Sequence, residues 1–239
     1  MENSQILTEN QFLYERLYTK EEYFPRYPAD WVIRFHNMYL KKHIPSGRVM
    51  DYGFGSGNNS VFFLEKGYET WGLETTNAAF PLLKANLESR NLDLALIDRF
   101  SLMSPETTHL PYEDSFFDCI ISNQVLYYLP SESHIQAICS EMLRCLRPGG
   151  CVFFTMMGLK NYYITHHAKA IHAGNIYEVT VEEPQNRLFG INQLIFVVRD
   201  ESHLKQVFSA FECLTVGYFD QSMFDLTSNF HWIFVGQKP

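Results

Sequence analysis

The sequence predicts an α/β fold built on a doubly wound, mostly parallel sheet. Short apolar runs that read as strands alternate with segments of helical period, and Gly and Pro residues separate them. The chain has 239 residues, of which 46% are hydrophobic and 15% aromatic, so it is long and apolar enough to bury one large core. We therefore expect a single domain over residues 1–239.

The first elements form a parallel βαβ unit. Residues 48–52 and 69–74 read as buried strands, joined by a Gly-rich turn and a short helix around 58–66. A helix over 77–87 follows, with Asn77 as its cap and a proline in its first turn. This order places both strands side by side, with their carboxyl ends at one edge of the sheet.

The middle of the chain continues the alternation. Residues 92–98 read as a third strand and residues 117–122 as a fourth. Ser131 can cap an amphipathic helix, which the Arg-Pro-Gly-Gly sequence at 147–150 stops. A buried fifth strand is expected directly afterwards, at 151–157.

The remaining residues depart from this pattern. Residues 158–175 carry Tyr and His in a stretch expected to be helical, and residues 176–182 and 193–198 read as two extra strands. A helix near 201–211 and strands near 213–219 and 229–236 would complete the sheet. The predicted domain thus has an N-terminal helical cap (1–45), a core (46–157), an inserted lid (158–199) and the end of the sheet (200–239).

Charge and cysteine content exclude several classes. The net charge is −8, from 19 Lys and Arg against 27 Asp and Glu, and no basic stripe is present, so nucleic acid is not an expected partner. Five cysteines without a CxxC pair favour a reducing cytoplasm. Neither a signal-peptide pattern nor an apolar run of membrane-spanning length is present. The oligomeric state, monomer or homodimer, stays open.

A Gly-rich loop carries the strongest functional signal. In Asp51-Tyr52-Gly53-Phe54-Gly55-Ser56-Gly57, an acid at a strand end precedes three glycines at alternate positions, which lets backbone approach a ligand closely. The G-x-G-x-x-G fingerprint of dinucleotide sites fails here, because Asn58 or Ser60 stands at the third glycine position. Glu74 ends the second strand, where a doubly wound fold offers a carboxylate to ribose hydroxyls.

With these residues, the sequence resembles the class I S-adenosylmethionine (SAM)-dependent methyltransferases, particularly the branch that includes quinone-biosynthesis and other small-molecule enzymes. The resemblance spans about residues 46–157 and rests on VMDYGFGSGNNS (49–60), LE (73–74), LPYEDSFFDCIISNQVLYYL (110–129) and EMLRCLRPGG (141–150). It implies a Rossmann-like sheet of seven strands, the last antiparallel, with SAM lying across the carboxyl ends of the first strands.

The resemblance also implies roles for single residues. Asp51 and the glycines would hold the methionine part of SAM, and Glu74 would accept hydrogen bonds from both ribose hydroxyls. The expected cofactor-binding residues are Asp51, Gly53, Phe54, Gly55, Gly57, Glu74, Thr75, Glu106, Asn123 and Gln124. An acid near the adenine has two candidates: Asp98 lies at the expected end of the third strand, whereas Glu106 has the usual distance to Leu110-Pro111.

Methyl transfer from a sulfonium is an in-line displacement, so alignment in a dry pocket supplies most of the catalysis. A general base helps only an acceptor that arrives protonated. Tyr127 and His109 are the candidates for such a role, although a lone loop histidine is more often solvated.

The acceptor is expected to be a small organic molecule with an oxygen, nitrogen or carbon nucleophile. Its predicted contacts are Tyr27, Tyr127, Tyr128, Tyr162 and His166. Tyr23 and Phe24 of the N-terminal cap are further aromatic residues able to close over the site. The histidines of the insertion lack the spacing of metal ligands, so no metal is expected. The product of SAM would be S-adenosylhomocysteine (SAH).

Two other functions stay open. One is a SAM-binding protein without turnover, because methyl transfer needs no signature base. The other is a nicotinamide-dependent oxidoreductase, which the failed glycine count disfavours.

Overall fold

The structure is a computed structural model that describes residues 3–19, 26–172, 175–184, 190, 192–222 and 228–239. Tyr23 and Phe24, which the sequence analysis assigns to the N-terminal cap, lie outside these residues. Among the described residues, no helix combines the length and the hydropathy that crossing a bilayer requires.

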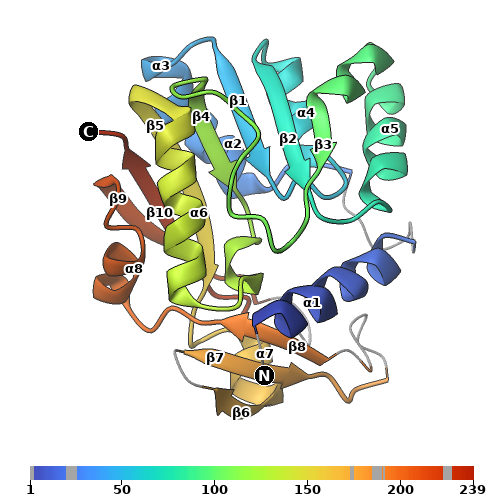
Figure 1. Cartoon of the computed structure of the whole chain (residues 1–239), viewed down its shortest axis with the longest axis vertical. Coiled ribbons are helices and arrows are strands. Elements are labelled where there is room, and N and C mark those ends of the chain that lie inside the picture. The colour runs from blue at the N-terminus through green and yellow to red at the C-terminus, as the bar shows by residue number, and fades with distance from the viewer. Residues whose placement is uncertain (1–2, 20–25, 173–174, 185–189, 191, 223–227) are drawn as a thin grey trace.

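A seven-stranded sheet forms the centre of the molecule (Figure 1). Its strands are β1 (Arg48–Tyr52), β2 (Glu69–Glu74), β3 (Phe100–Leu102), β4 (Phe117–Ser122), β5 (Leu146–Met157), β9 (Glu212–Phe219) and β10 (His231–Gln237). The order is β3-β2-β1-β4-β5-β10-β9, in which β10 runs antiparallel to both neighbours and the other pairings are parallel. The predicted doubly wound sheet with an antiparallel strand is confirmed, and its order reverses between β1 and β4.

Helices cover both faces of this sheet. They are α2 (Asp30–Phe35), α3 (Lys41–His43), α4 (Asn58–Glu65), α5 (Ala79–Ser89), α6 (Glu132–Cys145) and α8 (Glu201–Val207), with a π-helical turn at His36–Leu40. Strand β5 illustrates how the pleat divides the core. Cys151 and Phe153 pack with α2 and α4, whereas Val152 and Phe154 pack with α6 and α8. Alternate residues of buried parallel strands face opposite layers, so the strands read as continuous apolar runs.

The third strand is the clearest error of the sequence prediction. Residues 92–98 do not form a strand; a 3-10 helix spans Leu94–Arg99, and β3 occupies only Phe100–Leu102. The side chain of Asp93 accepts a hydrogen bond from the backbone N–H of Ala95 at 2.9 Å. A local cap of this kind competes with strand pairing and leaves most of these apolar side chains partly exposed.

Helix ends show one confirmed cap and one that fails. The Ser131 hydroxyl accepts from the backbone N–H of His134 at 3.1 Å, as predicted. Asn77 does not cap α5, because that helix begins at Ala79 after a turn in which the Asn77 carbonyl accepts from the Phe80 N–H. Strand β5 starts five residues earlier than predicted, and a break in its register with β4 accommodates the Pro-Gly-Gly sequence.

The insertion after β5 forms a second sheet. It contains α7 (Tyr162–His167) and the antiparallel strands β6 (Ala168–His172), β7 (Ile176–Thr180) and β8 (Asn192–Phe196). The two predicted strands are present, but the helix expected over 158–175 is limited to α7, and β6 takes up much of the remainder.

The N-terminal helix α1 (Asn3–Tyr18) lies between the two sheets (Figure 1). The amide of Asn10 donates to the backbone carbonyls of Tyr128, 2.9 Å away, and of Leu194, 3.2 Å away. One side chain therefore ties α1 both to the loop after β4 and to β8, and it closes the space at the carboxyl edge of the large sheet.

Candidate functional site

The loop after β1 depends on three glycines in the left-handed region. Gly53, Gly55 and Gly57 have φ angles of 77°, 54° and 76°. A Cβ atom at Gly53 would overlap the Val125 side chain, and one at Gly57 would overlap Leu83. Glycine is required both by the backbone conformation and by this close packing. The loop thereby lies close against the end of β2, where the backbone N–H of Gly53 donates to the Leu73 carbonyl at 2.8 Å.

Glu74 stands beside this loop at the end of β2. Its Oε2 accepts from the backbone N–H of Gly55 at 3.0 Å, and its Oε1 accepts from the backbone N–H of Thr75 at 2.7 Å. Only 7% of Glu74 is exposed, and burial raises the pKa of its carboxyl group while these N–H donors oppose the rise. Each carboxylate oxygen has more than one acceptor position, so a ligand hydroxyl can still donate to it.

Asp51 lies beneath the loop rather than in an open position. The Ser60 hydroxyl donates to its Oδ2 at 2.6 Å, and the residue is 1% exposed. Burial raises the pKa of Asp51 to about 7, and the hydrogen bond from Ser60 counteracts this rise. Its contact joins the end of β1 to the first turn of α4, and so fixes the loop between them.

The residues that follow β4 form another wall of the candidate site, across from the glycine loop and Glu74. Asn123 Oδ1 accepts from the indole N–H of Trp31 at 2.6 Å. Gln124 has a φ of 60°, uncommon for a residue other than glycine, and its backbone N–H donates to the Thr155 hydroxyl at 2.7 Å. Backbone strain of this kind persists where surrounding contacts hold it, often at functional sites.

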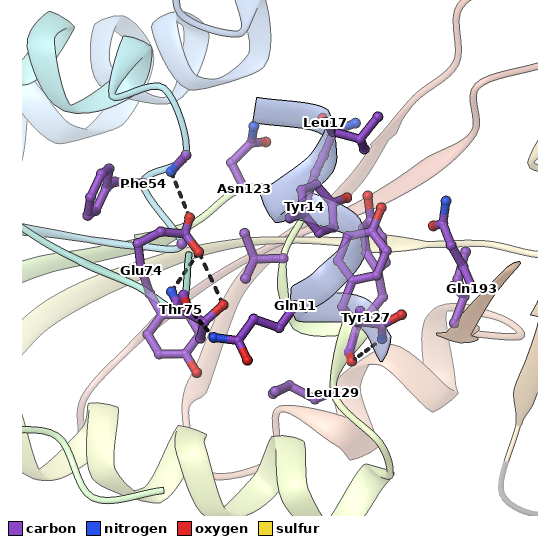
Figure 2. Close-up of a pocket in the computed structure, with 18 of the residues that line it drawn as sticks. Gln11, Tyr14, Leu17, Phe54, Glu74, Thr75, Asn123, Tyr127, Leu129 and Gln193 are labelled. Carbon is purple, nitrogen blue, oxygen red and sulfur yellow. Dashed lines mark hydrogen bonds between the residues drawn. The ribbon is translucent and has the colours of Figure 1, made fainter. Parts of the chain in front are cut away.

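These parts enclose a cavity of about 380 Å³, within the size range of small-molecule sites. Figure 2 shows Glu74, Thr75 and Gln11 on one side, and Tyr14, Tyr127 and Gln193 on the other. The α1 residues that line it are Leu7, Asn10, Gln11, Tyr14, Leu17 and Tyr18. Further lining residues after β5 are Met157, Tyr163, Val179, Gln193, Ile195, Asn229 and His231. Among the described lining residues, Glu74 is the only Asp, Glu, Lys or Arg.

Tyrosine rings gather along one part of the cavity, and the hydroxyl of Tyr18 lies near enough to Glu74 for its carboxylate to add to the rise in the Tyr18 pKa. The ring centroids of Tyr127 and Tyr128 are 4.5 Å apart, and those of Tyr14 and Tyr128 are 5.1 Å apart in an edge-to-face arrangement. Burial raises the pKa of Tyr14 and of Tyr18 well above the usual tyrosine value, so both hydroxyls stay neutral. This region offers aromatic faces and uncharged hydroxyl groups.

Most of the predicted residues meet at this cavity. Those that line it are Gly53, Phe54, Gly55, Glu74, Thr75, Asn123, Gln124, Tyr127 and Tyr128. Gly57 and Asp51 do not line it, and Asp51 instead holds the loop through its hydrogen bond from Ser60.

Two predicted acceptor contacts in the insertion are not brought to the cavity. The Tyr162 hydroxyl donates to Glu183 Oε1 at 2.9 Å, and His166 is exposed on α7. Their neighbour Tyr163 lines the cavity instead. The reason is helical geometry, since consecutive residues of α7 face directions about 100° apart.

Three other candidates also lie elsewhere. Tyr27 is 73% exposed, with the Arg90 guanidinium 5.4 Å from its ring centroid. His109 is exposed and pairs with Glu141, Nδ1 to Oε2 at 2.8 Å, so it does not reach the cavity as a base. Neither Glu106 nor Asp98 lines the cavity, and both are exposed.

The chain between these two acids nevertheless reaches the site, through Met103 and Pro105. Asp98 is exposed on the 3-10 helix that replaces the predicted third strand, and Glu106 is exposed in the loop after β3.

Sequence reasoning missed Tyr14, Gln193 and His231. Tyr14 and Tyr18 are four residues apart on one face of α1, a spacing that was visible in the sequence. Gln193 lies on the second sheet, and no sequence signal indicated which face of that sheet meets the cavity. His231 begins a strand that runs antiparallel to β5, so it starts at the carboxyl edge of β5. Within the described part of the chain, no three His, Cys, Asp or Glu side chains cluster in a way that could hold a metal ion.

Comparison with known proteins agrees with this geometry. A family model described as a methyltransferase domain matches residues 50–154, which run from β1 to β5. The match includes the glycine loop, Glu74 and the wall after β4, and it leaves out α1 and the second sheet.

Two curated relatives match the same region. One is a ubiquinone/menaquinone biosynthesis C-methyltransferase from Nitrosospira multiformis, 31% identical over 110 residues, which covers 44% of this chain and 41% of the relative. The other is a ubiquinone biosynthesis O-methyltransferase from Burkholderia thailandensis, 27% identical over 134 residues, which covers 55% and 54%. The chain thus spans about half the length of these relatives.

A solved structure is similar over more of the chain. The crystal structure of a SAM-dependent methyltransferase from Methanosarcina mazei matches with a TM-score of 0.60 at 19% sequence identity. The match covers 80% of this chain and 92% of that one. At this identity the likeness concerns the fold, and it extends beyond the segment that the family model matches.

Proposed function

We propose that this chain, which belongs to the class I SAM-dependent methyltransferases, transfers the methyl group of SAM to a small organic acceptor. One observation carries the proposal: the left-handed glycine loop after β1 and the Glu74 carboxylate border the same cavity, beside the point where the strand order reverses. Cofactors of doubly wound folds bind at this point.

The distribution of polar groups supports one orientation of SAM. We assign the methionine part to the loop at Gly53 and Gly55, facing the wall at Asn123. The ribose hydroxyls would donate to Glu74, and the adenine would lie toward Met103 and Pro105, the cavity residues beyond Thr75. In this orientation the sulfonium group lies near the chain after β4 and faces the tyrosine-lined part of the cavity.

The remaining part of the cavity favours an uncharged acceptor. Its walls are mainly aromatic and aliphatic, with amide groups from Asn10 and Gln193. Because no Lys or Arg is among the described lining residues, nothing there would neutralise a phosphate or a carboxylate. A small, mostly apolar acceptor with few polar groups fits these walls best.

The protein's contribution to the reaction is mainly positioning. SAM supplies an electrophilic methyl group on a sulfonium centre, and the acceptor must lie in line with the carbon–sulfur bond at about 3 Å. Helix α1, held by Asn10 and by the Gln11 amide that donates to the Thr75 carbonyl at 2.6 Å, covers the cavity and limits the access of water. The tyrosine rings would hold the acceptor by apolar contact.

Thermal unfolding with excess SAH, SAM, NAD or no ligand tests the proposal. A ligand at 100 times its dissociation constant adds about 2.7 kcal/mol to native stability, which gives a measurable shift. Stabilisation by SAH and SAM but not by NAD is the expected result. Stabilisation by NAD alone would favour an oxidoreductase, and no stabilisation by SAH would refute the proposal.

An acceptor screen that measures SAH release then separates enzyme from binding protein. Release of SAH that depends on an added acceptor is expected. A protein that binds SAM tightly and releases no SAH with any acceptor would be a SAM-binding protein without turnover.

A further inference from the structure

His231 is a buried histidine whose role the fold does not explain. It lines the cavity and is 1% exposed. Its Nδ1 lies 3.1 Å from the backbone carbonyl oxygen of Asn229, an acceptor, so Nδ1 carries the hydrogen and donates it. The lone pair therefore resides on Nε2, which has no hydrogen-bond partner among the described residues. A buried polar atom without a partner is costly and calls for a functional explanation.

The surrounding elements hold the imidazole in a defined place. The ring stacks on Phe219, with centroids 4.9 Å apart, and Phe219 stacks on Trp31 in turn. Trp31 donates to Asn123 in the wall after β4. This chain of contacts links the orientation of His231 to the part of the cavity where the methyl group of SAM would lie.

The position of His231 also follows from the topology. As the first residue of β10 it pairs with Met157, the last residue of β5, at the carboxyl edge of the sheet. Its ring centroid lies 5.6 Å from that of Tyr127, which follows β4. The imidazole is thus two strands away from β4, on the acceptor side of the cavity and among the tyrosine rings.

The imidazole is neutral before any ligand binds. Burial lowers the pKa of His231 to about 4, while the Asn229 carbonyl and the Asp220 carboxylate oppose this shift. Among the described residues, the ring of Tyr127 lies 5.6 Å from that of His231, and Tyr163 lines the same cavity. At neutral pH the lone pair of Nε2 is therefore unprotonated and can accept a hydrogen bond from a ligand hydroxyl.

We propose that Nε2 of His231 accepts the hydroxyl proton of the methyl acceptor, and that this acceptor is a neutral hydroxyarene. The inference rests on the proposed function and names the substrate class and a catalytic residue for the same site. Aromatic walls favour a flat aromatic acceptor, and the unpartnered Nε2 favours an acceptor that donates a hydrogen bond.

The step balances in atoms and charge. The hydroxyl oxygen forms a bond to the methyl carbon, and the carbon–sulfur bond breaks with its electron pair going to sulfur. The hydroxyl proton moves to Nε2. The products are a methyl ether, SAH and an imidazolium, which returns its proton to water when the products leave. Positive charge moves from the sulfonium to the imidazolium, so the net charge of the cavity does not change during the step.

Two variants test the inference with SAM and a panel of neutral phenols, including catechol and 2-methoxyphenol. His231→Gln keeps an acceptor oxygen near the position of Nε2 but is not a base. We expect its KM for a phenol to stay within about threefold and its kcat to fall about 10²- to 10⁴-fold, the usual contribution of a general base. His231→Phe removes the acceptor atom and should weaken phenol binding as well.

His134→Gln is the matched control. His134 on α6 also has an Nε2 without a hydrogen-bond partner in the described part of the chain, and burial lowers its pKa, but it does not line the cavity. Its substitution should change neither KM nor kcat. Both His231 variants should keep the affinity of the wild type for SAH.

A spectroscopic measurement separates contact from structural support. In ¹⁵N NMR with SAH bound, 2-methoxyphenol should shift the Nε2 resonance of His231, and 1,2-dimethoxybenzene, which lacks the hydroxyl donor, should not. The role of His231 would be overturned if His231→Gln kept the wild-type kcat. It would also be overturned if no phenol changed the chemical shift of the Nε2 resonance. Absence of turnover with every phenol, in protein that SAH stabilises, would overturn the hydroxyarene assignment. Failure of SAH to stabilise the wild type would instead count against the proposed function.

Discussion

The backbone N–H of Gly55 donates a hydrogen bond to Oε2 of Glu74 at 3.0 Å. This bond joins the glycine loop after β1 to the last residue of β2. The backbone register, in which Tyr52 pairs with Leu73, brings the two strand ends level. The carboxylate therefore helps to shape the loop before any ligand arrives, and it has acceptor positions left for a ligand hydroxyl.

Glu74→Ala should weaken SAH binding by roughly ten- to a hundredfold, from the loss of about 1.4–3 kcal/mol of charge-assisted hydrogen bonding. Isothermal titration calorimetry measures the change. Glu69→Ala is the control, because Glu69 begins the same strand at the far edge and is exposed. Equal SAH affinity in Glu74→Ala and wild type would disprove the ribose assignment.

Gly53→Ala should destabilise the protein by more than Gly67→Ala. Both glycines have positive φ, 77° and 86°, so both substitutions strain the backbone by about 1–2 kcal/mol. Only at Gly53 would the new Cβ overlap Val125, whereas nothing lies near a Cβ at Gly67. We expect about 1–3 kcal/mol of extra destabilisation at Gly53. Urea denaturation measures it, and adding Val125→Ala should restore part of the difference; equal losses at the two glycines would contradict the packing argument.

Asp51→Asn should change how stability depends on pH. The folded pKa of Asp51, about 7, exceeds its usual value of 3.8, so the folded state binds this proton more tightly than the unfolded state does. The contribution to stability is fully present below the lower value and is lost as pH rises through about 7.

Relative to Asp51→Asn, the wild type should lose up to roughly 1.4 kcal/mol of unfolding free energy per pH unit across this window. Denaturation curves at several pH values measure this difference, with exposed Asp98→Asn as the control. Parallel pH profiles for wild type and Asp51→Asn would show that the buried carboxyl does not titrate there.

Asn10→Ala should release α1 from the rest of the molecule. Its amide donates to two backbone carbonyls, one after β4 and one on β8. Loss of these bonds should lower the unfolding free energy by about 1–3 kcal/mol and weaken SAH binding, because α1 forms a wall of the cavity. Faster proteolysis within α1 would report the release. Phe12→Ala is the control, since Phe12 on the same helix is 67% exposed, and equal protease sensitivity of the two variants would count against this role of Asn10.

Local interactions explain where the sequence prediction succeeded and where it failed. The alternation of apolar runs identified β1, β2 and β4 at their observed bounds, because buried parallel strands are apolar on both faces. It failed at 92–98, where the local cap at Asp93 outweighed strand propensity. Propensity at such short segments is a weak guide once a local hydrogen bond competes with pairing.

The sequence by itself predicted the doubly wound sheet, the resemblance to the methyltransferases and the half of the candidate site that comes from contiguous motifs, which are the glycine loop, Glu74 and the residues after β4. Only the tertiary structure decided the other half. Tyr14 of α1, Gln193 of the second sheet and His231 of β10 reach the same cavity from positions far apart in the chain. Such motifs can be recognised in a sequence because the chemistry of a loop needs residues at fixed spacing. A wall assembled from separate elements has no such spacing, because strand register and helix packing alone bring its residues together.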